Sequence, residues 1–367
     1  MKGYLSYGLP GPGFWDAYQE LWEESLYRPA FQAPHYLRAL AEASEEQLGI
    51  YQFYLAGQLS GAALFQKTGK RYHFLSDLKS GQNFFVLHRK LNDEEIEYFF
   101  GNLLWLIKRE NWAVVLNMQP AWASYMPILQ RACTSSHLFW EVVPFALSPI
   151  LKLDTGAQVA EHLNQSAHLR KKMSQLFRRH EVVFEVLHDD QYLDDWLEAY
   201  FHWHVRRWEH TATPSNYSSP RERQLFKACL RGWIEDGLAV RFAFRLPSGE
   251  RFALCIGLVQ ENALIDYYMI YDPAYAQYSP AKGLLPFIGK WMEEENLNCL
   301  DLGYGEYEYK YEFANDTLEI QRIYLSRYRN LPLIIKAETE KTYREHPQLM
   351  AFYRKNIKSL IRFYPSR

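Results

Sequence analysis

The stretch Glu261–Phe313 constrains the fold of this chain more than any other part of the sequence. Its first segment, Ala263–Tyr271, is rich in Ile, Tyr and Met and predicts a strand, which ends before Pro273 because proline donates no backbone hydrogen bond. Ser279-Pro280 predicts the start of a helix, with serine as the N-cap and proline at the first helical position. A short buried strand is expected at Cys299–Leu302, and a loop rich in Gly, Tyr, Glu and Lys follows it. The order strand, helix, strand predicts a parallel strand pair with the helix packed across it.

The predicted helix offers an anion site at its N-terminus. Apolar residues recur at the spacing of one buried helix face, at Leu284, Leu285, Ile288, Trp291 and Met292. The backbone N–H groups of Ala281 to Leu284 and the positive end of the helix dipole suit a phosphate. Lys282 adds a positive charge, and Gly283 removes a side chain where a ligand could approach closely. The alternative interpretation is an ordinary capped helix of an α/β domain.

Length and composition exclude several classes of protein. The chain has 367 residues, which is enough for two domains, and its net charge of −2 provides no global field for binding nucleic acid. No apolar run reaches 18 residues and no secretory segment follows the first two residues, so we expect a cytoplasmic protein without an integral membrane span. The four cysteines are scattered without a CxxC pair, which favours reduced thiols and argues against a metal site.

The two halves of the chain share one order of elements: helices, an antiparallel hairpin, a strand, a helix and a strand. In the first half we expect helices at Phe14–Leu26, Pro34–Glu46, Asn92–Glu110 and Met126–Cys133, and strands at Gly49–Tyr54, Leu59–Gln66, Arg71–Leu75, Ala113–Leu116 and Phe145–Leu151. In the second half we expect helices at Gln158–Asn164, Ala167–Arg179, Gln191–Arg207 and Glu222–Asp236, and strands at Val182–Leu187, Val240–Arg245, Arg251–Gln260 and Leu318–Arg327. A basic helical tail is expected at Lys336–Arg367. The pattern is typical of an α/β fold, and duplication of one unit is a structural hypothesis.

Four segments carry a resemblance to a known family. They are HLRKKMSQLFRRHEVVFEV (His168–Val186), HVRRW (His204–Trp208), YDPAYAQYSPAKGLL (Tyr271–Leu285) and DLGYGEYEYKYEF (Asp301–Phe313). In their order and spacing the chain resembles the GNAT-type acyltransferases related to the cellulose-biosynthesis protein CelD, called BioF2-like, which are similar in turn to the Fem aminoacyl-transferases. The resemblance implies a tandem GNAT architecture of two mixed sheets flanked by helices. It implies a degenerate GNAT-like domain at residues 1–150, a GNAT domain with an acyl-CoA cleft at 151–335, and the basic tail at 336–367.

The resemblance also implies where the co-substrate binds. The strand before the helix is expected to splay from the next strand, and acyl-CoA, such as acetyl-CoA, is expected to lie in the gap. The pyrophosphate would then meet the helix end, with Ser279, Ala281, Lys282, Gly283 and Leu284 as the binding residues. Members of the family usually carry glycine where this chain has Ala281, and the extra methyl group is expected to move the pyrophosphate outward.

Acyl transfer to an amine needs a base, stabilisation of the carbonyl oxygen, and alignment of the two reactants. Asp301, Glu306 and Lys310 lie at or just beyond the C-terminal end of the predicted strand, which is where α/β sheets bind ligands. We expect Glu306 or Asp301 to be the base, and Lys310 or the phenol of Tyr309 or Tyr307 to hold the leaving thiolate or an acceptor carboxylate. The alternative for these charges is a surface loop or an internal Glu–Lys pair.

Residues from other segments are expected to bind the acceptor. Side chains alternate along a strand, so only one of Tyr267 and Tyr268 is expected to face a cleft, and Tyr268 is the candidate. Arg207 can fork onto a carboxylate or phosphate, and Trp208 and Tyr307 are further candidates.

Three functions remain open from the sequence. The first is an N-acyltransferase that uses acyl-CoA and acts on an amine of a small molecule or sugar. The second is a Fem-like transferase that uses aminoacyl-tRNA, bound through the basic residues Arg170, Lys171, Lys172, Arg178 and Arg179; the near-neutral total charge argues against this nucleic-acid partner. The third is a non-catalytic partner module in polysaccharide assembly.

Overall fold

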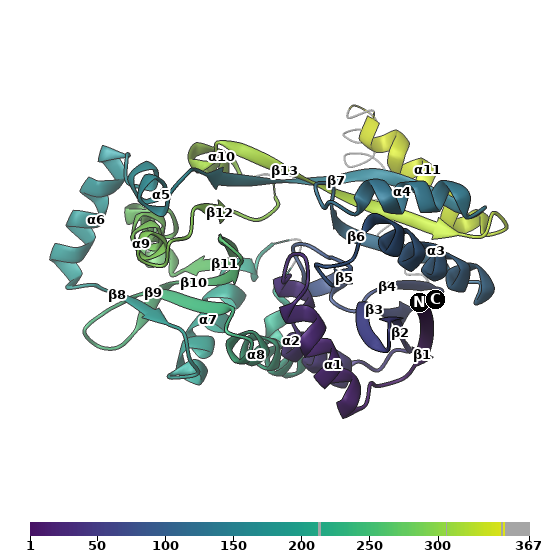
Figure 1. Ribbon diagram of the computed structural model, residues 1–367. Helices are drawn as coiled ribbons and strands as arrows, with labels where there is room; N and C mark the ends of the chain where they lie inside the picture. The colour runs from purple at the N-terminus through teal and green to yellow at the C-terminus, as the bar shows by residue number, and fades with distance from the viewer. Residues whose placement is uncertain (212–213, 306, 346–347, 349–367) are drawn as a thin grey trace.

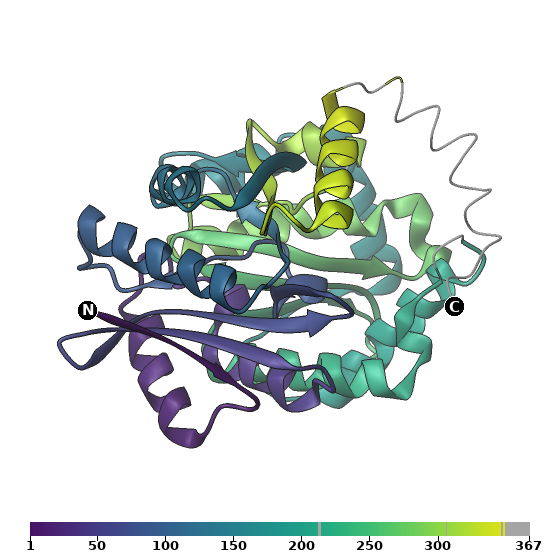
Figure 2. The same cartoon turned by 90° about the vertical axis from the view of Figure 1, so that its right-hand side faces the viewer.

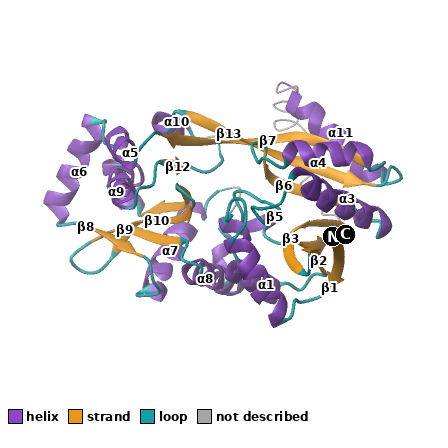
Figure 3. Ribbon diagram, viewed as in Figure 1, coloured by secondary structure: helices purple, strands orange, loops and turns teal. Residues whose placement is uncertain are grey.

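A computed structural model of the chain describes residues 1–211, 214–305, 307–345 and 348. Within these residues the strands form one mixed sheet of 13 strands with helices on both faces (Figures 1 and 3). The predicted α/β architecture is confirmed, but the two predicted sheets are joined into one continuous sheet.

The first half of the chain follows most of the predicted elements. The observed helices and strands of this half are β1 Lys2–Tyr7, α1 Pro12–Glu23, α2 Pro34–Ala43, β2 Leu48–Leu55, β3 Gln58–Thr68, β4 Arg71–Phe74, β5 Val86–Leu87, α3 Asp93–Arg109, β6 Val114–Pro120, α4 Met126–Ser135 and β7 Phe139–Lys152. Strands β1 and β5 were not predicted from the sequence. Strand β1 pairs only with β2 at the edge of the sheet and buries little of either face, so it carries no hydrophobic alternation that a pattern could detect.

The second half also follows the predicted order. Its elements are α5 Gly156–Leu163, α6 Ala167–His180, β8 Val183–Leu187, α7 Leu193–Trp208, α8 Pro220–Glu235, β9 Ala239–Arg245, β10 Arg251–Gln260, β11 Ala263–Tyr271, α9 Pro280–Glu294, β12 Cys299–Asp301, α10 Glu308–Phe313, β13 Asp316–Ser326 and α11 Leu331–Glu345. The prediction of a loop up to Phe313 was wrong, because α10 forms there. The predicted boundaries at 150 and 335 fall inside β7 and α11, and most of the predicted tail lies outside the described residues.

The two halves exchange their last strands. Strand β7 of the first half pairs with β12 of the second, and β13 of the second half pairs with β6 of the first. Between them, β7 and β13 run antiparallel along the whole of β13, from Asp316 opposite Ile150 to Ser326 opposite Phe139. In Figure 1 these two strands cross the top of the molecule and connect its two ends. Each half-sheet is therefore completed by a strand from the other half.

The predicted parallel pair is confirmed, and its two strands part after a short contact. Strand β11 pairs with β12 only from Ala263 to Ile265, opposite Cys299 to Asp301. The rest of β11, from Asp266 onward, has no register with β12. The first half contains a similar parting, because β4 and β6 share only the pair Tyr72 and Val114.

Helices cover both faces of the sheet, and one core spans both halves of the chain. In β3, Leu64 packs in the core that contains α1, whereas its neighbour Phe65 packs in the core that contains α3, so these helices lie on opposite faces (Figure 2). The core under α1 and α2 continues beneath α7 and α8 of the second half. There Tyr36 of α2 stacks on Trp233 of α8 with ring centroids 4.2 Å apart.

Close packing of α2 against α8 predicts the effect of one added methyl group. Gly232 lies on α8, where a Cβ would come within 2.6 Å of the backbone of His35 and Tyr36. We expect Gly232→Ala to lower the free energy of unfolding by about 2 kcal/mol, because backbone atoms must move to admit the methyl group. Urea denaturation followed by tryptophan fluorescence measures this change.

Gly101 provides the matched control, because it lies in α3 and a Cβ there would have no heavy atom within 4 Å. Gly101→Ala is expected to stabilise the chain by about 0.5–1 kcal/mol through helix propensity alone. A Gly232→Ala variant as stable as the wild type would contradict the packing described for α2 and α8.

Candidate active site

A cavity of 620 Å³, which we call the main cavity, lies where β11 leaves β12. Six residues that the sequence singled out line it: Arg207, Trp208, Tyr268, Tyr307, Tyr309 and Lys310. They come from the end of α7, from β11, and from α10 with the residue before it. The parting of β11 and β12 therefore gathers residues that are about a hundred positions apart in the sequence.

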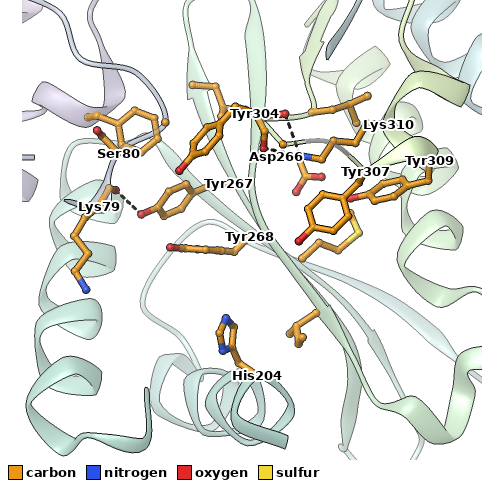
Figure 4. A pocket seen from close by; sticks show the side chains of 18 of the residues that line it. Lys79, Ser80, His204, Asp266, Tyr267, Tyr268, Tyr304, Tyr307, Tyr309 and Lys310 are labelled. Atoms are coloured by element: carbon orange, nitrogen blue, oxygen red, sulfur yellow. Dashed lines mark hydrogen bonds between the residues drawn. The ribbon is translucent and has the colours of Figure 1, made fainter. Parts of the chain in front are cut away.

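Both Tyr267 and Tyr268 line the main cavity, so the prediction that only one of them faces a cleft was wrong (Figure 4). The reason is a β-bulge. Ile256 of β10 lies opposite Tyr268 and Gly257 lies opposite Asp266, so Tyr267 is an extra residue without a partner. A bulge interrupts the alternation of side chains along a strand. The two tyrosine rings lie 4.2 Å apart as a result.

Asp266 is a buried carboxylate in the wall of the main cavity. Burial raises its pKa to about 6, although the positive charge of Lys310 opposes that shift. The thiol of Cys255 lies 3.5 Å from its Oδ1. At neutral pH the carboxylate is thus ionised but poised to accept a proton, which is the property required of a general base. The sequence placed Asp266 on the strand but gave no signal that distinguished it from other acids.

Lys310 projects from α10 toward the same point. Its Nζ donates hydrogen bonds to the carbonyl oxygens of Gly303 at 3.0 Å and Tyr304 at 3.1 Å, and only 7% of the residue is exposed. Burial lowers the pKa of Lys310, whereas the carboxylates of Asp266 and Asp301 raise it. Lys310 therefore holds the loop after β12 and supplies a positive charge beside Asp266 (Figure 4).

Asp301 and Glu306 were the two residues predicted to act as the base. Asp301 is 3% exposed, and its carboxylate accepts hydrogen bonds from Ser148 Oγ at 2.5 Å, Gln82 Nε2 at 2.7 Å and the Gly303 amide at 2.8 Å. Asp301 does not line the main cavity. Its hydrogen bonds instead connect β7, the segment of Gln82 and the loop after β12. Glu306 lies outside the described residues.

Burial also affects two uncharged groups of the cavity wall. Burial raises the pKa of the Tyr309 phenol, so this hydroxyl stays protonated and can donate a hydrogen bond. Burial, with the nearby charge of Arg207, lowers the pKa of His204 to about 4. The imidazole of His204 is therefore neutral at physiological pH, with Nδ1 2.8 Å from Ser215 Oγ.

A second cavity, of 560 Å³, lies at the N-terminus of α9, and we call it the helix-end cavity. It is lined by residues of α5, α6, α9 and α10 and of the turns beside them, among them Lys172, Ser279, Lys282 and Glu312. Lys172 Nζ donates to Ser279 Oγ at 2.9 Å, and Lys282 Nζ donates to the carboxylate of Glu312 at 2.6 and 2.8 Å. Helix α10 separates the two cavities, because Tyr309 and Lys310 line one and Glu312 lines the other.

Two predictions for the start of α9, those for Ser279 and Gly283, need correction. Ser279 precedes the helix as expected, but its backbone is left-handed with φ of 56°, and its side chain makes no capping hydrogen bond. The space beside Gly283 holds Met173 of α6, whose sulfur would lie 2.3 Å from an added Cβ, so this glycine serves helix packing. The side chain of Leu284 is fully buried in the core, so this residue could meet a ligand only through its backbone, as predicted. Of the predicted set, Ser279 and Lys282 line the helix-end cavity.

The first half contributes to the main cavity, which the sequence did not indicate. Phe31, Lys79, Ser80 and Gly81 form one wall. Their segments read as turns without periodicity, and their approach to β11 depends on the joined sheet. Among the described residues, no group of three or more His, Cys, Asp or Glu side chains could hold a metal ion, and no helix has the length and apolarity needed to cross a membrane.

Comparisons with known proteins agree with this geometry. Residues 164–311 match the family described as "Acetyltransferase (GNAT) domain". The crystal structure of FemX superposes with a TM-score of 0.62 at 10% identity and covers 90% of this chain and 99% of its own. L-PGS from Bacillus licheniformis gives 0.58 at 13% identity, with 91% and 98% covered. A conserved protein of unknown function from Bacteroides thetaiotaomicron gives 0.58 at 9% identity, with 88% and 100% covered.

A search of curated proteins found no match to the sequence. The structural similarities extend over nearly the whole chain at low identity and therefore establish its fold. Residues 164–311 match a GNAT-type acetyltransferase domain, and the overall fold of the chain is similar to those of FemX and L-PGS.

Proposed function

We propose that the chain is an N-acyltransferase that moves an acyl group, acetyl in the simplest case, from acyl-CoA to the amine of a small molecule or sugar. The observation that carries this proposal is Asp266, a buried carboxylate with a pKa of about 6 in the wall of a cavity inside a GNAT-type domain. An amine must lose a proton when it is acylated, and a carboxylate with a raised pKa is suited to accept it.

The helix-end cavity fits the phosphates of CoA. Lys172 and Lys282 place two positive charges at the N-terminus of α9, where the first backbone N–H groups have no partner inside the helix. Lys282 is paired with Glu312, so a bound phosphate would compete with that carboxylate. When bound, acyl-CoA supplies a thioester, whose carbonyl carbon is open to attack by an amine.

In this proposal, different residues of the main cavity carry out different steps of the acyl transfer. The amine nitrogen attacks the thioester carbon, the new C–N bond forms, the C–S bond breaks, and the carboxylate of Asp266 accepts the proton that the amine loses. The phenol of Tyr309 is a protonated group in the cavity wall, and in this proposal it returns a proton to the leaving sulfur. Lys310 keeps the loop carbonyls of Gly303 and Tyr304 fixed and supports the ionised form of Asp266.

A second donor class is favoured by a separate observation. Helix α6 carries five basic residues and no acidic one, and Arg170, Lys171, Arg178 and Arg179 are exposed. Such a face suits the backbone of an aminoacyl-tRNA. Within the GNAT class, the four sequence segments favour the CelD-related group, and a non-catalytic role in polysaccharide assembly would apply if the side chains of the main cavity proved dispensable in the cell.

The two donors predict opposite effects of charge removal. If CoA is the donor, it raises the melting temperature of the wild type, and Lys172→Ala with Lys282→Ala weakens CoA binding at least tenfold, because each charge-assisted contact contributes about 1.5–3 kcal/mol. Lys171→Ala, an exposed change on the same helix, leaves CoA binding unchanged. Calorimetric titration with CoA measures both effects.

If aminoacyl-tRNA is the donor, the exposed residues of α6 matter and the residues of the helix-end cavity do not. Lys171→Ala combined with Arg178→Ala then weakens binding of tRNA and reduces its salt dependence, while CoA gives no thermal shift. A wild-type chain whose melting temperature does not respond to CoA or to any short acyl-CoA would refute the proposed donor.

Removal of the proposed base should affect turnover rather than donor binding. Asp266→Asn is expected to lower kcat by about 10²–10⁴, the usual contribution of a general base, with CoA affinity unchanged. Asp195→Asn, an exposed change on α7, is expected to leave kcat unchanged. Steady-state kinetics with acetyl-CoA and an amine acceptor measures both variants, and full activity of Asp266→Asn would exclude this residue as the base.

The raised pKa of Asp266 also predicts a pH-dependent stability. An unfolded aspartate has a pKa of about 3.9, so ionisation of Asp266 penalises the folded state fully above pH 6 and not at all well below pH 4. As pH rises from 4 to 7.5, the unfolding free energy of Asp266→Asn should gain about 2–3 kcal/mol relative to the wild type. Chemical denaturation at both pH values measures this gain, and Asp195→Asn should show none.

A further inference from the structure

Helix α7 brings two polar side chains, His204 and Arg207, to the main cavity. They are three positions apart, a spacing that places side chains on the same face of a helix, and both line the cavity. The ring of Trp208 lies beside both of them. The His204 ring is stacked on it with centroids 6.2 Å apart, and the Arg207 guanidinium lies 5.9 Å from its centroid. The end of α7 therefore forms one wall of the cavity with two adjacent polar groups.

The hydrogen bonds of His204 decide which ring nitrogen carries its proton. Its Nδ1 lies 2.8 Å from Ser215 Oγ, and this oxygen already accepts the backbone N–H of Tyr217 at 3.1 Å. Ser215 is buried, and Nδ1 is the acceptor that the described residues offer to its hydroxyl proton, so the hydroxyl donates to Nδ1. The imidazole of His204 is neutral, and its proton therefore lies on Nε2.

The Nε2 atom of His204 is open to the main cavity. It has no hydrogen-bond partner among the described residues, yet it is not one of their fully enclosed unpaired atoms, so a ligand can reach it. In Figure 4 the ring of His204 rises from α7 toward Tyr268. His204 therefore offers the cavity an uncharged N–H donor.

Arg207 adds a positive charge beside this donor. Of the other cations that line the main cavity, Lys79 forms an ion pair with Glu222. Lys310 lies beside the carboxylate of Asp266. Arg207 is exposed and forms no ion pair or hydrogen bond within the described part of the chain, so the N–H groups of its guanidinium remain available to a ligand.

A guanidinium next to an uncharged N–H donor matches a carboxylate. The planar fork of Arg207 can donate two parallel hydrogen bonds to the oxygens of a carboxylate, and His204 Nε2 can donate a third. A phosphate of CoA is already matched by Lys172 and Lys282 in the helix-end cavity, so the anion at the end of α7 belongs to the acceptor. Asp266, in the same cavity, is suited to the amine of that acceptor.

We propose that His204 and Arg207 bind a carboxylate of the acceptor, and that the acceptor is an amino acid whose amine lies at Asp266. This inference rests on the proposed function, since it assigns the acceptor of the same transfer. It makes His204 and Arg207 binding residues that determine specificity, because they contact a group other than the reacting amine.

The test uses the full chain, acetyl-CoA and three amino acids of increasing length, glycine, β-alanine and 4-aminobutyrate, each compared with its own uncharged amide. The wild type is expected to use at least one acid with a kcat/KM about tenfold higher than that of its amide, because the amide lacks the charge that Arg207 binds. Steady-state kinetics measures this preference.

Two variants remove the proposed contacts one at a time. Arg207→Gln is expected to raise the KM for the preferred acid about tenfold with kcat within twofold, and to leave the kinetics with the amide unchanged. His204→Asn keeps a polar group for Ser215 but lacks Nε2, and it should raise the same KM about fivefold. Arg206→Gln is the matched control, because Arg206 is exposed on α7 and does not line the main cavity, and it should change neither substrate.

Binding of the acceptor can be separated from binding of the donor phosphates. Calorimetric titration should give the same CoA affinity for Arg207→Gln as for the wild type, and a loss of about tenfold would assign Arg207 to the donor and overturn the proposal. Wild-type kinetics in which every amide equals its acid, or an equal effect of Arg207→Gln on acid and amide, would also overturn it while transfer itself stands.

Failure of the proposed function gives a different result. The wild type then shows no thermal shift with CoA and acylates none of the six amines. Calorimetric binding of the three acids decides the carboxylate site in that case. Binding that Arg207→Gln weakens about tenfold supports the site, and equal binding by this variant, or no binding by the wild type, overturns it.

Discussion

The antiparallel pairing of β7 with β13 is the interaction on which the rest of the structure depends. Because these strands also border β12 and β6, two half-sheets that would otherwise each end at an open edge are completed by each other. A cavity at the parting of β11 and β12 thus lies beside residues of the first half. The same pairing explains why Gln82 reaches Asp301 across 219 positions of sequence.

The buried charges beside the parting of β11 and β12 are arranged around Lys310. Lys310 is buried and shares its charge between Asp266 and Asp301, but the two carboxylates differ in environment. Asp301 is satisfied by Ser148, Gln82 and the Gly303 amide, whereas Asp266 faces the cavity with a thiol as its near neighbour. Two acids of the same type therefore take different roles, one positioning the loop after β12 and the other suited to proton transfer.

A single extra residue in β11 changes the composition of the cavity. The bulge at Tyr267 turns two consecutive tyrosines toward the same space, and the hydroxyl of Tyr267 then donates a hydrogen bond to the carbonyl oxygen of Lys79 in the first half. Both tyrosine rings thus line the cavity beside Asp266.

The sequence by itself determined the elements that depend on local pattern. The strand–helix–strand unit from Ala263 to Asp301, the apolar face of α9, and the capping box of α3 at Asn92 and Glu95 all rest on contacts within a few residues. It also placed Lys310 just beyond the C-terminal end of β12, because this residue follows that strand closely in the chain.

The tertiary structure alone decided the exchange of β7 and β13, the role of Gly283 and the orientation of Tyr267. Each depends on a partner far away in the sequence: β13 on β6, Gly283 on Met173, and the bulge on the register of β10. It also selected Asp266 over Asp301 as the acid that faces the cavity. Burial and hydrogen-bond partners set the pKa of a carboxylate, and a one-dimensional pattern does not specify either of them.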